Sequence, residues 1–436
     1  MLFGCNQDSS TTTFSDIRRL PPAHRLTCSS AGLALQRYWT LPIEEPVYYR
    51  DDREYIERFR GLLHEAVADR LRTNRVSVFM SGGLDSPALA ATAVECLKAP
   101  DAVQAFTLVY DWLIPDSERQ YACKVAKYLN IPIQVFALDE ETAWALPGSI
   151  KTPEPAEQLS NPAVRLRYYR SMATHSRVAL YGEGPDNALL YDWRPHLAWL
   201  GRKRRWGRLL LDVGHHLASH KRVPLLPSVP RMLQDWRKRN RSQPVFPDWL
   251  NRRMVDRLGL RERWSASSVG TRSMHPVRPR AYSSLVSHLW PLLFEELEPP
   301  YTGAALEVRH PYVDVRLLRF LLTMPALPWC RNKHLLRSAL RGVIPEVVRQ
   351  RPKTPLQKKP DFERAGAHGM PPVLASTRLA AYCDSGRVNV QRSESVASFY
   401  ADSRASALSY WLHDLDSIHI DKEGDSYVHR EDTVVV

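Results

Sequence analysis

The sequence lacks the features of several protein classes. It has no uninterrupted apolar run of about 18 residues, so we expect no membrane span and no membrane partner. Residues 1–13 are polar and contain no apolar core of a signal peptide. The six cysteines lie far apart and form no Cys-x-x-Cys pair, which argues against a zinc site and a disulfide scaffold. These absences favour the reducing cytoplasm.

The charge of the chain permits an anionic partner without identifying one. There are 60 Lys and Arg residues against 47 Asp and Glu residues, a formal net charge of +13. Many of the cations lie between Arg202 and Arg241, beside Trp206 and Trp236, where they could hold RNA phosphates. The sequence contains no recognisable RNA-binding motif, so we do not expect a nucleic-acid partner. A solvated helix face is the simpler interpretation of this stretch.

The pattern of apolar residues predicts an α/β fold. Short β-rich runs alternate with segments of helical periodicity, which is typical of a parallel sheet covered by helices on both faces. The predicted strands are 76–80, 103–110, 131–136 and 177–181, and the predicted helices are 54–72, 87–97, 117–129 and 161–176. After Asp192 only helices are expected. The 436 residues divide into 1–50, an α/β core at 51–193, a basic helical insertion at 194–300, a helical part at 301–420 and a loose tail at 421–436.

The strongest motif is Ser81-Gly82-Gly83-Leu84-Asp85-Ser86, between the first predicted strand of the core and the helix from Pro87. Its glycines allow a sharp turn and a close ligand, and the following helix offers free N–H groups to an anion. Ser81 and Ser86 add hydroxyl donors. Asp85 would repel phosphate unless it holds Mg²⁺. The motif therefore predicts a nucleotide-phosphate loop, not of the Walker type, with an ordinary strand–turn–helix corner as the alternative.

A second loop, Tyr181-Gly182-Glu183-Gly184-Pro185-Asp186-Asn187, follows the fourth predicted strand. Ligands of open α/β sheets bind at the carboxyl ends of strands. We therefore expect Asp85 and Asp186 to share one Mg²⁺, which leaves Glu183 for acid/base work. A dinucleotide fingerprint fails because the third glycine is missing. A solvated acidic turn is the alternative.

These motifs resemble those of a known family. The first loop is similar to the pyrophosphate-binding loop of the ATP pyrophosphatase (PP-loop) superfamily, whose members split ATP into AMP and pyrophosphate. The second is similar to the Gly-Glu-Gly-Ala-Asp-Glu segment of asparagine synthetases, although Pro185 replaces a small residue and Asn187 replaces an acid. The resemblance implies a PP-loop, adenine nucleotide alpha hydrolase-like fold, with Glu183 as the catalytic acid/base, Asp186 as a metal ligand and Gly182 in the nucleotide site.

Other segments extend the resemblance over residues 50 to 415. Glu307 to Asp314 matches a mostly structural segment, in which Asp314 caps a helix. Arg351-Pro352-Lys353 matches the family's Arg-x-Lys, which implies that Lys353 faces the phosphates during adenylation; a surface lysine is the alternative. Leu108 lies where the family packs adenine, although core packing explains it equally well. Glu118 lies where the family has an acid at a helix start, and a first-turn acid is the simpler interpretation.

The resemblance implies an AMP-forming amide ligase that uses ATP and Mg²⁺. The carboxylate would be that of aspartate, activated as β-aspartyl-AMP, and the amine would be ammonia. Two alternatives remain open. The first is a ring-closing amide synthetase of the lasso-peptide cyclase or β-lactam synthetase type, acting on a peptide or small-molecule carboxylate. The second is a tRNA-modifying PP-loop enzyme.

Residues 14–39 resemble the end of a glutaminase domain and its linker, so we interpret residues 1–50 as a remnant of that domain. The family's glutaminase uses a cysteine that follows the initiator methionine. Here residue 2 is Leu, and Cys5 is not at that position. We therefore expect no glutamine hydrolysis by this chain. Its nitrogen would come from elsewhere, which leaves room for a separate amine-donor or peptide-carrier protein.

Overall fold

The computed structural model describes residues 8–114, 116–140, 144–146, 151–155, 159, 162–220, 245–267, 275–354, 356, 358–374, 376–388 and 395–417. Its centre is a five-stranded sheet of order β5-β4-β3-β6-β7, and all of the pairings are parallel. The strands are β3 (Val76–Phe79), β4 (Val103–Val109), β5 (Ile133–Ala137), β6 (Val178–Leu180) and β7 (Glu307–Arg309). Val78 lies opposite Ala105 on one side and Leu180 on the other.

Helices cover both faces of this sheet. They are α1 (Asp52–Leu71), α2 (Asp85–Leu97), α3 (Glu118–Leu129) and α4 (Ala163–His175). One buried cluster joins Val78 and Ala105 to α1, α2 and α3, while another joins Phe106 and Ala179 to α4. Neighbouring strand residues therefore face opposite apolar layers, as in parallel sheets that are buried on both sides. The predicted α/β fold is confirmed.

The helix starts follow local sequence signals. Asp51 caps α1, and a capping box with Glu54 satisfies two backbone N–H groups. Asp314 caps α14 by accepting a hydrogen bond from Arg316 N, as predicted. The prediction missed β7, since 307–314 was interpreted as a turn into a helix. Three residues carry little periodicity, and β7 is defined by its pairing with β6 rather than by its own sequence.

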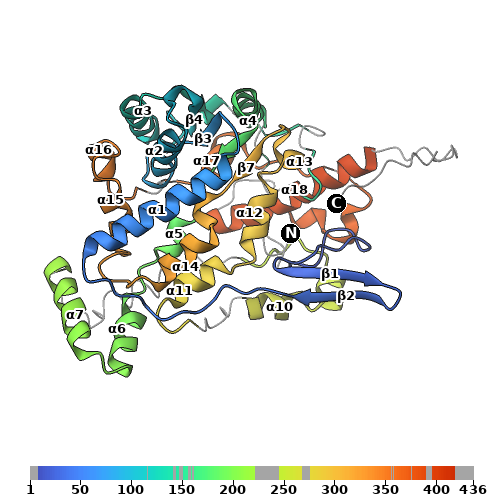
Figure 1. Cartoon of the computed structure of the whole chain (residues 1–436). Helices are drawn as coiled ribbons and strands as arrows, with labels where there is room; N and C mark the ends of the chain where they lie inside the picture. Colours follow the sequence, from blue (N-terminus) through green and yellow to red (C-terminus); the bar gives the residue numbers. More distant parts are fainter. Residues whose placement is uncertain are drawn as a thin grey trace.

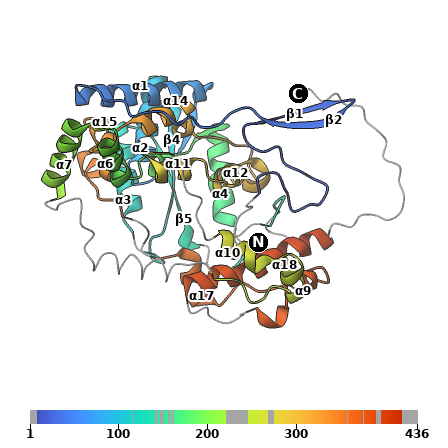
Figure 2. The same cartoon turned by 90° about the horizontal axis from the view of Figure 1, so that it is seen from below.

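The rest of the chain is mostly helical (Figures 1 and 2). These helices are α5 (Pro185–Ala188), α6 (Trp193–Arg202), α7 (Trp206–His220), α9 (Arg252–Arg257), α10 (Leu260–Ser267), α11 (Pro279–Leu285), α12 (Leu289–Glu295), α13 (Pro299–Thr302), α14 (Val315–Thr323), α15 (His334–Ala339), α16 (Glu346–Arg349), α17 (Pro360–His368) and α18 (Val396–Ser417). Short 3-10 turns lie at Pro100–Ala102, Leu138–Glu140, Pro311–Val313, Arg331–Lys333, Leu379–Ala381 and Ser385–Arg387.

A further apolar cluster lies away from the sheet. Trp249 and Leu250 pack there against Leu408 and Leu412 of α18, and Figure 2 shows α9, α10, α17 and α18 gathered on that side. This cluster joins residues from both sides of the boundary proposed at residue 300, and the division itself stays a prediction. Residues 221–244, the centre of the basic stretch, and the tail 421–436 lie outside the described residues.

The N-terminal segment contains an antiparallel hairpin of β1 (His24–Ser29) and β2 (Gly32–Arg37). It projects from the helical body in both views (Figures 1 and 2). A check for membrane spans over the described residues finds no helix with the length and apolar character that crossing requires.

Candidate active site

The two loops predicted from the sequence meet at the centre of the sheet. The phosphate loop, residues 81–86, follows β3, and the second loop, residues 181–187, follows β6, the neighbouring strand. Strands β3, β4 and β5 succeed one another in one direction, and β6 lies on the other side of β3. The strand order therefore reverses between these loops, which is where open α/β sheets bind ligands.

Two glycines allow the second loop to approach the first closely. A Cβ atom on Gly182 would lie 3.1 Å from Ser86 N. Gly184 has φ +131°, and a Cβ there would lie 2.9 Å from Tyr312 Cβ. Tyr312 in turn donates a hydrogen bond to Asp85 O over 2.9 Å. Glycine is thus required on steric grounds in the turn that carries Glu183 and Asp186.

The serine hydroxyls shape the phosphate loop. Ser86 Oγ accepts a hydrogen bond from Ser81 N over 2.8 Å and lies 3.0 Å from Ser81 Oγ. Ser81 Oγ accepts a longer bond, of 3.3 Å, from Gly83 N. No side chain caps the start of α2 at Leu84. The first turn of α2 therefore presents N–H groups without a side-chain cap at the end of the loop, as an anion site needs.

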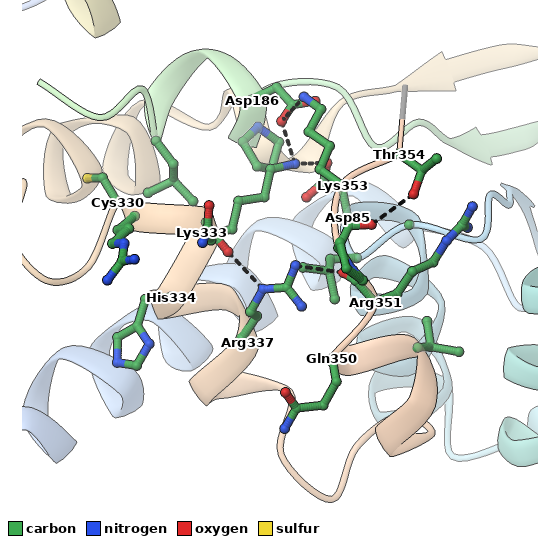
Figure 3. A pocket seen from close by; sticks show the side chains of 18 of the residues that line it. Asp85, Asp186, Cys330, Lys333, His334, Arg337, Gln350, Arg351, Lys353 and Thr354 are labelled. Carbon is green, nitrogen blue, oxygen red and sulfur yellow. Dashed lines mark hydrogen bonds and ion pairs between the residues drawn. The ribbon is translucent and has the colours of Figure 1, made fainter. Parts of the chain in front are cut away.

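One lysine ammonium joins the two predicted metal ligands (Figure 3). Lys333 Nζ lies 2.5 Å from Asp85 Oδ2 and 2.7 Å from Asp186 Oδ1. Lys353 Nζ lies 2.9 Å from the same Asp186 oxygen. The structure thus brings Asp85, Asp186 and Lys353 together, and it adds Lys333, which the sequence analysis did not single out.

The two lysines differ in their freedom to move. The side chain of Lys333 is 15% exposed, whereas that of Lys353 is 69% exposed. Burial would lower the pKa of Lys333, but Asp85 and Asp186 raise it above the ordinary value, so this lysine carries its charge. Lys333 is therefore a mostly buried cation held by two carboxylates, and Lys353 is an exposed one at the rim.

The carboxylates of the site have different proton affinities. Burial raises the pKa of Asp85, against the opposing effect of Lys333. Burial also acts on Asp186, but hydrogen bonds from Lys333 and Lys353 hold its pKa below the ordinary value. Glu183 is half-buried, and burial raises its pKa, followed by the negative charges of Asp186 and Asp85. A raised carboxyl pKa suits an acid/base group.

The donor set fits a magnesium ion bound together with phosphates. Asp85 Oδ1 is buried and has no hydrogen-bond partner among the described residues. Mg²⁺ takes oxygen ligands, and in nucleotide sites one or two carboxylates with substrate phosphates suffice. No group of three or more His, Cys, Asp or Glu residues in the described part of the chain could hold a metal by itself. Asp85 and Asp186 are therefore suited to a metal that arrives with a nucleotide.

A cavity of about 970 Å³ opens beside these groups. Its wall includes the loop from Ser81 to Asp85 together with Asp186, Lys333, Arg351 and Lys353. Glu183 and Leu108 are not part of this wall. Leu108 is half-buried and packs against two apolar clusters of the core, in agreement with its packing interpretation.

Asn187, which replaces the family's acid, bonds to a helix outside the two loops. Asn187 Nδ2 donates a hydrogen bond to Ser284 Oγ of α11 over 2.8 Å. Pro185 is the first residue of α5, where its fixed φ and missing N–H suit the start of a helix. The two departures from the family pattern are thus accommodated by local structure.

Comparison with known proteins identifies the family. A profile of the asparagine synthase family matches residues 58–410. The chain belongs to the asparagine synthase family. "Asparagine synthetase [glutamine-hydrolyzing] 3" of Bacillus subtilis is 24% identical over 385 residues, which cover 81% of this chain and 56% of that protein.

Other relatives match smaller parts. "Amidase chry2" of Gibberella zeae is 29% identical over 147 residues, 30% of this chain and 22% of that protein. A solved NH3-dependent NAD synthetase from Campylobacter jejuni aligns with a TM-score of 0.22 and 18% identity, over 32% of this chain and 60% of the other. The chain thus spans about half the length of its Bacillus relative, and less of the Gibberella one.

Proposed function

We propose that this member of the asparagine synthase family is an AMP-forming amide ligase. One observation carries the proposal. Two carboxylates, Asp85 and Asp186, converge from two loops at the reversal of strand order and hold one cation between them. This arrangement lies at the mouth of a phosphate-binding loop, so it suits a nucleotide whose phosphates arrive with Mg²⁺.

In the first half-reaction, a substrate carboxylate oxygen attacks the α-phosphorus of ATP. The bond between the α-phosphorus and the bridging oxygen breaks, and pyrophosphate leaves. Asp85 and Asp186 would hold Mg²⁺, which neutralises phosphate charge when bound. The N–H groups in the first turn of α2 direct partial positive charge at the phosphates, and Lys333 adds an ammonium in a fixed position. Lys353 is exposed enough to turn from Asp186 to a phosphate.

In the second half-reaction, an amine attacks the activated acyl carbon and AMP leaves. The attacking nitrogen must lose a proton, and we assign its removal to Glu183, which lies in the same loop as Asp186. Its raised pKa makes it a better base than an ordinary carboxylate. By family resemblance, the first acid to test is aspartate and the first amine is ammonia, taken directly and not from glutamine.

The test measures AMP and pyrophosphate released from ATP and Mg²⁺ with aspartate and ammonium. The site variant is Asp85→Ala, and the control is Asp101→Ala, which removes an exposed acid within the 3-10 turn Pro100–Ala102 before β4. We expect AMP from the wild type and the control, and at least a hundredfold less from Asp85→Ala. Release of ADP and phosphate would contradict the proposal. AMP formed with a peptide that carries both groups, but not with aspartate, would identify a ring-closing ligase.

A further inference from the structure

The second residue of the phosphate loop is held by a neighbouring ion pair. Gly82 N donates to Glu118 Oε2 over 2.6 Å, and Gly82 O accepts from Arg351 Nη1 over 2.9 Å. Arg351 Nη1 also lies 2.8 Å from Glu118 Oε1. A Cβ on Gly82 would lie only 2.6 Å from both Arg351 Nη1 and Tyr121 Cβ. Both backbone polar groups of Gly82 are therefore engaged by one carboxylate–guanidinium pair.

Arg351 is fixed from several sides. Its side chain is 9% exposed, its Nη2 donates to Ser117 Oγ over 3.0 Å, and its guanidinium lies 4.2 Å from the centre of the Tyr121 ring. Arg337 Nη2 donates to Arg351 O over 2.8 Å. The guanidinium and the backbone of Arg351 are thus both anchored, two residues before Lys353. Figure 3 shows this segment running along the cavity.

The contacts of Glu118 differ from those expected of a first-turn acid. Glu118 is the first residue of α3, but its two carboxylate oxygens bond Gly82 and Arg351. An acid that only complemented the helix dipole would need neither contact. Glu118 and Arg351 instead connect α3, the phosphate loop and the segment that carries Lys353.

We propose that Glu118 and Arg351 are positioning residues: the pair sets the phosphate loop through Gly82 and delivers Lys353 to the phosphates. The activity part of this inference rests on the proposed function. Neither residue needs to touch the reacting atoms. A displacement of about 1 Å in either segment is enough to lower the rate of a positioned reaction by about a hundredfold.

The first test uses the protein without nucleotide. Glu118→Gln removes the charged acceptor of Gly82 N, and we expect amide hydrogen exchange in the peptide that contains Gly82 to quicken about tenfold or more. The matched control is Glu346→Gln, which breaks the ion pair of Glu346 with Arg349 on α16. Equal exchange in that peptide in both variants would overturn the proposal.

The second test separates positioning from general damage. Arg351→Gln should lower the rate of AMP release about thirtyfold in the wild-type background, but less than threefold when Lys353→Ala is already present, because the first change acts through the second residue. Arg351→Lys keeps the charge but not the planar set of donors, so its rate of AMP release should lie between those of the wild type and Arg351→Gln. It replaces Arg351→Gln in the experiment if that variant does not fold. Additive losses would refute the delivery of Lys353 by Arg351.

If the wild type releases no AMP with any carboxylate, the proposed function fails, and the positioning role is then decided by binding and exchange. Glu118→Gln and Arg351→Lys should weaken the binding of ATP with Mg²⁺ about tenfold, measured by calorimetry, while Glu346→Gln leaves it unchanged. Unchanged affinity in all three variants, together with unchanged exchange, would overturn the inference.

Discussion

Replacement of Lys333 by Met tests the central charge arrangement. The change keeps a long side chain but removes the ammonium that lies 2.5 Å from Asp85 and 2.7 Å from Asp186. Asp186 retains Lys353, 2.9 Å away. Asp85 loses its only ion-pair partner in the described part of the chain. We expect the variant to be less stable than the wild type at neutral pH and to depend on Mg²⁺ for part of its stability.

The magnitude follows from burial. Removal of one partner from a fully buried ion pair costs about 3–5 kcal/mol. The side chains of Lys333 and Asp85 are 15% and 20% exposed, so water compensates in part. We therefore expect a loss of about 2 kcal/mol in the free energy of unfolding. A double variant with Asp85→Asn should lose less, about 1 kcal/mol, since no uncompensated carboxylate remains. Mg²⁺ at ten times its dissociation constant should restore about 1.4 kcal/mol to Lys333→Met.

Urea unfolding with and without Mg²⁺ measures these values. The control is Lys358→Met, which breaks an ion pair with Glu363 at a lysine that is 57% exposed, and it should change stability by less than about 0.5 kcal/mol. The loss in Lys333→Met should also shrink as pH falls, because burial raises the pKa of Asp85 and a protonated Asp85 needs no cation. A Lys333→Met protein as stable as the wild type and indifferent to Mg²⁺ would refute the reasoning.

Three further predictions follow from single groups. Glu183→Gln should keep carboxylate-dependent exchange between ATP and pyrophosphate but slow amide formation at least about a hundredfold. The rate of amide formation by the wild type should decline on acidification with a midpoint above the ordinary pKa of 4.5, because the pKa of Glu183 is raised. A midpoint at or below 4.5 would contradict this role. Gly184→Ala should destabilise the protein by about 2 kcal/mol, because Gly184 has φ +131° and a Cβ there would contact Tyr312. The control is Gly61→Ala, in open space on α1, which should not destabilise the protein. Equal effects of the two variants in thermal unfolding would argue against the steric requirement. Burial lowers the pKa of His310 to about 4, whereas the unfolded state binds a proton near pH 6.5. The contribution of neutral His310 to the free energy of unfolding is therefore present above pH 6.5 and is lost as pH falls toward 4. His310→Leu should flatten the pH dependence of the free energy of unfolding in that window.

The sheet and its first loops were predictable because local signals agree with the tertiary fold. Strands 76–80 and 103–110 in the prediction became β3 and β4, and the helix predicted at 54–72 became α1 at 52–71. The phosphate loop was recognisable because its glycines and serines stand between a strand and a helix. The meeting of Asp85 and Asp186 followed from one rule about the carboxyl ends of strands.

The cations of the site could not be placed by the same reasoning. Lys333 and Arg351 are separated from Asp85 by more than two hundred residues, and a single basic side chain has no periodicity that marks it as buried. For Arg351, the one available signal was its place in the segment Arg351-Pro352-Lys353 that resembles the family, and the sequence analysis had no comparable signal for Lys333. Glu118 was missed for another reason. Its place at the start of a helix was explained by the helix dipole alone, so nothing in the sequence indicated its contact with Gly82.

The arrangement of charges explains why the two lysines are not equivalent. Three cations of the site are bound to carboxylates: Lys333 to Asp85 and Asp186, Lys353 to Asp186, and Arg351 to Glu118. A nucleotide adds phosphate charge together with Mg²⁺, which competes for the same aspartate oxygens. Lys353 can then exchange its carboxylate for a phosphate at little cost, because it is mostly exposed. Lys333 is enclosed and cannot leave, so its charge remains fixed beside the metal ligands. Preorganised charge of this kind contributes most where negative charge develops on the departing pyrophosphate.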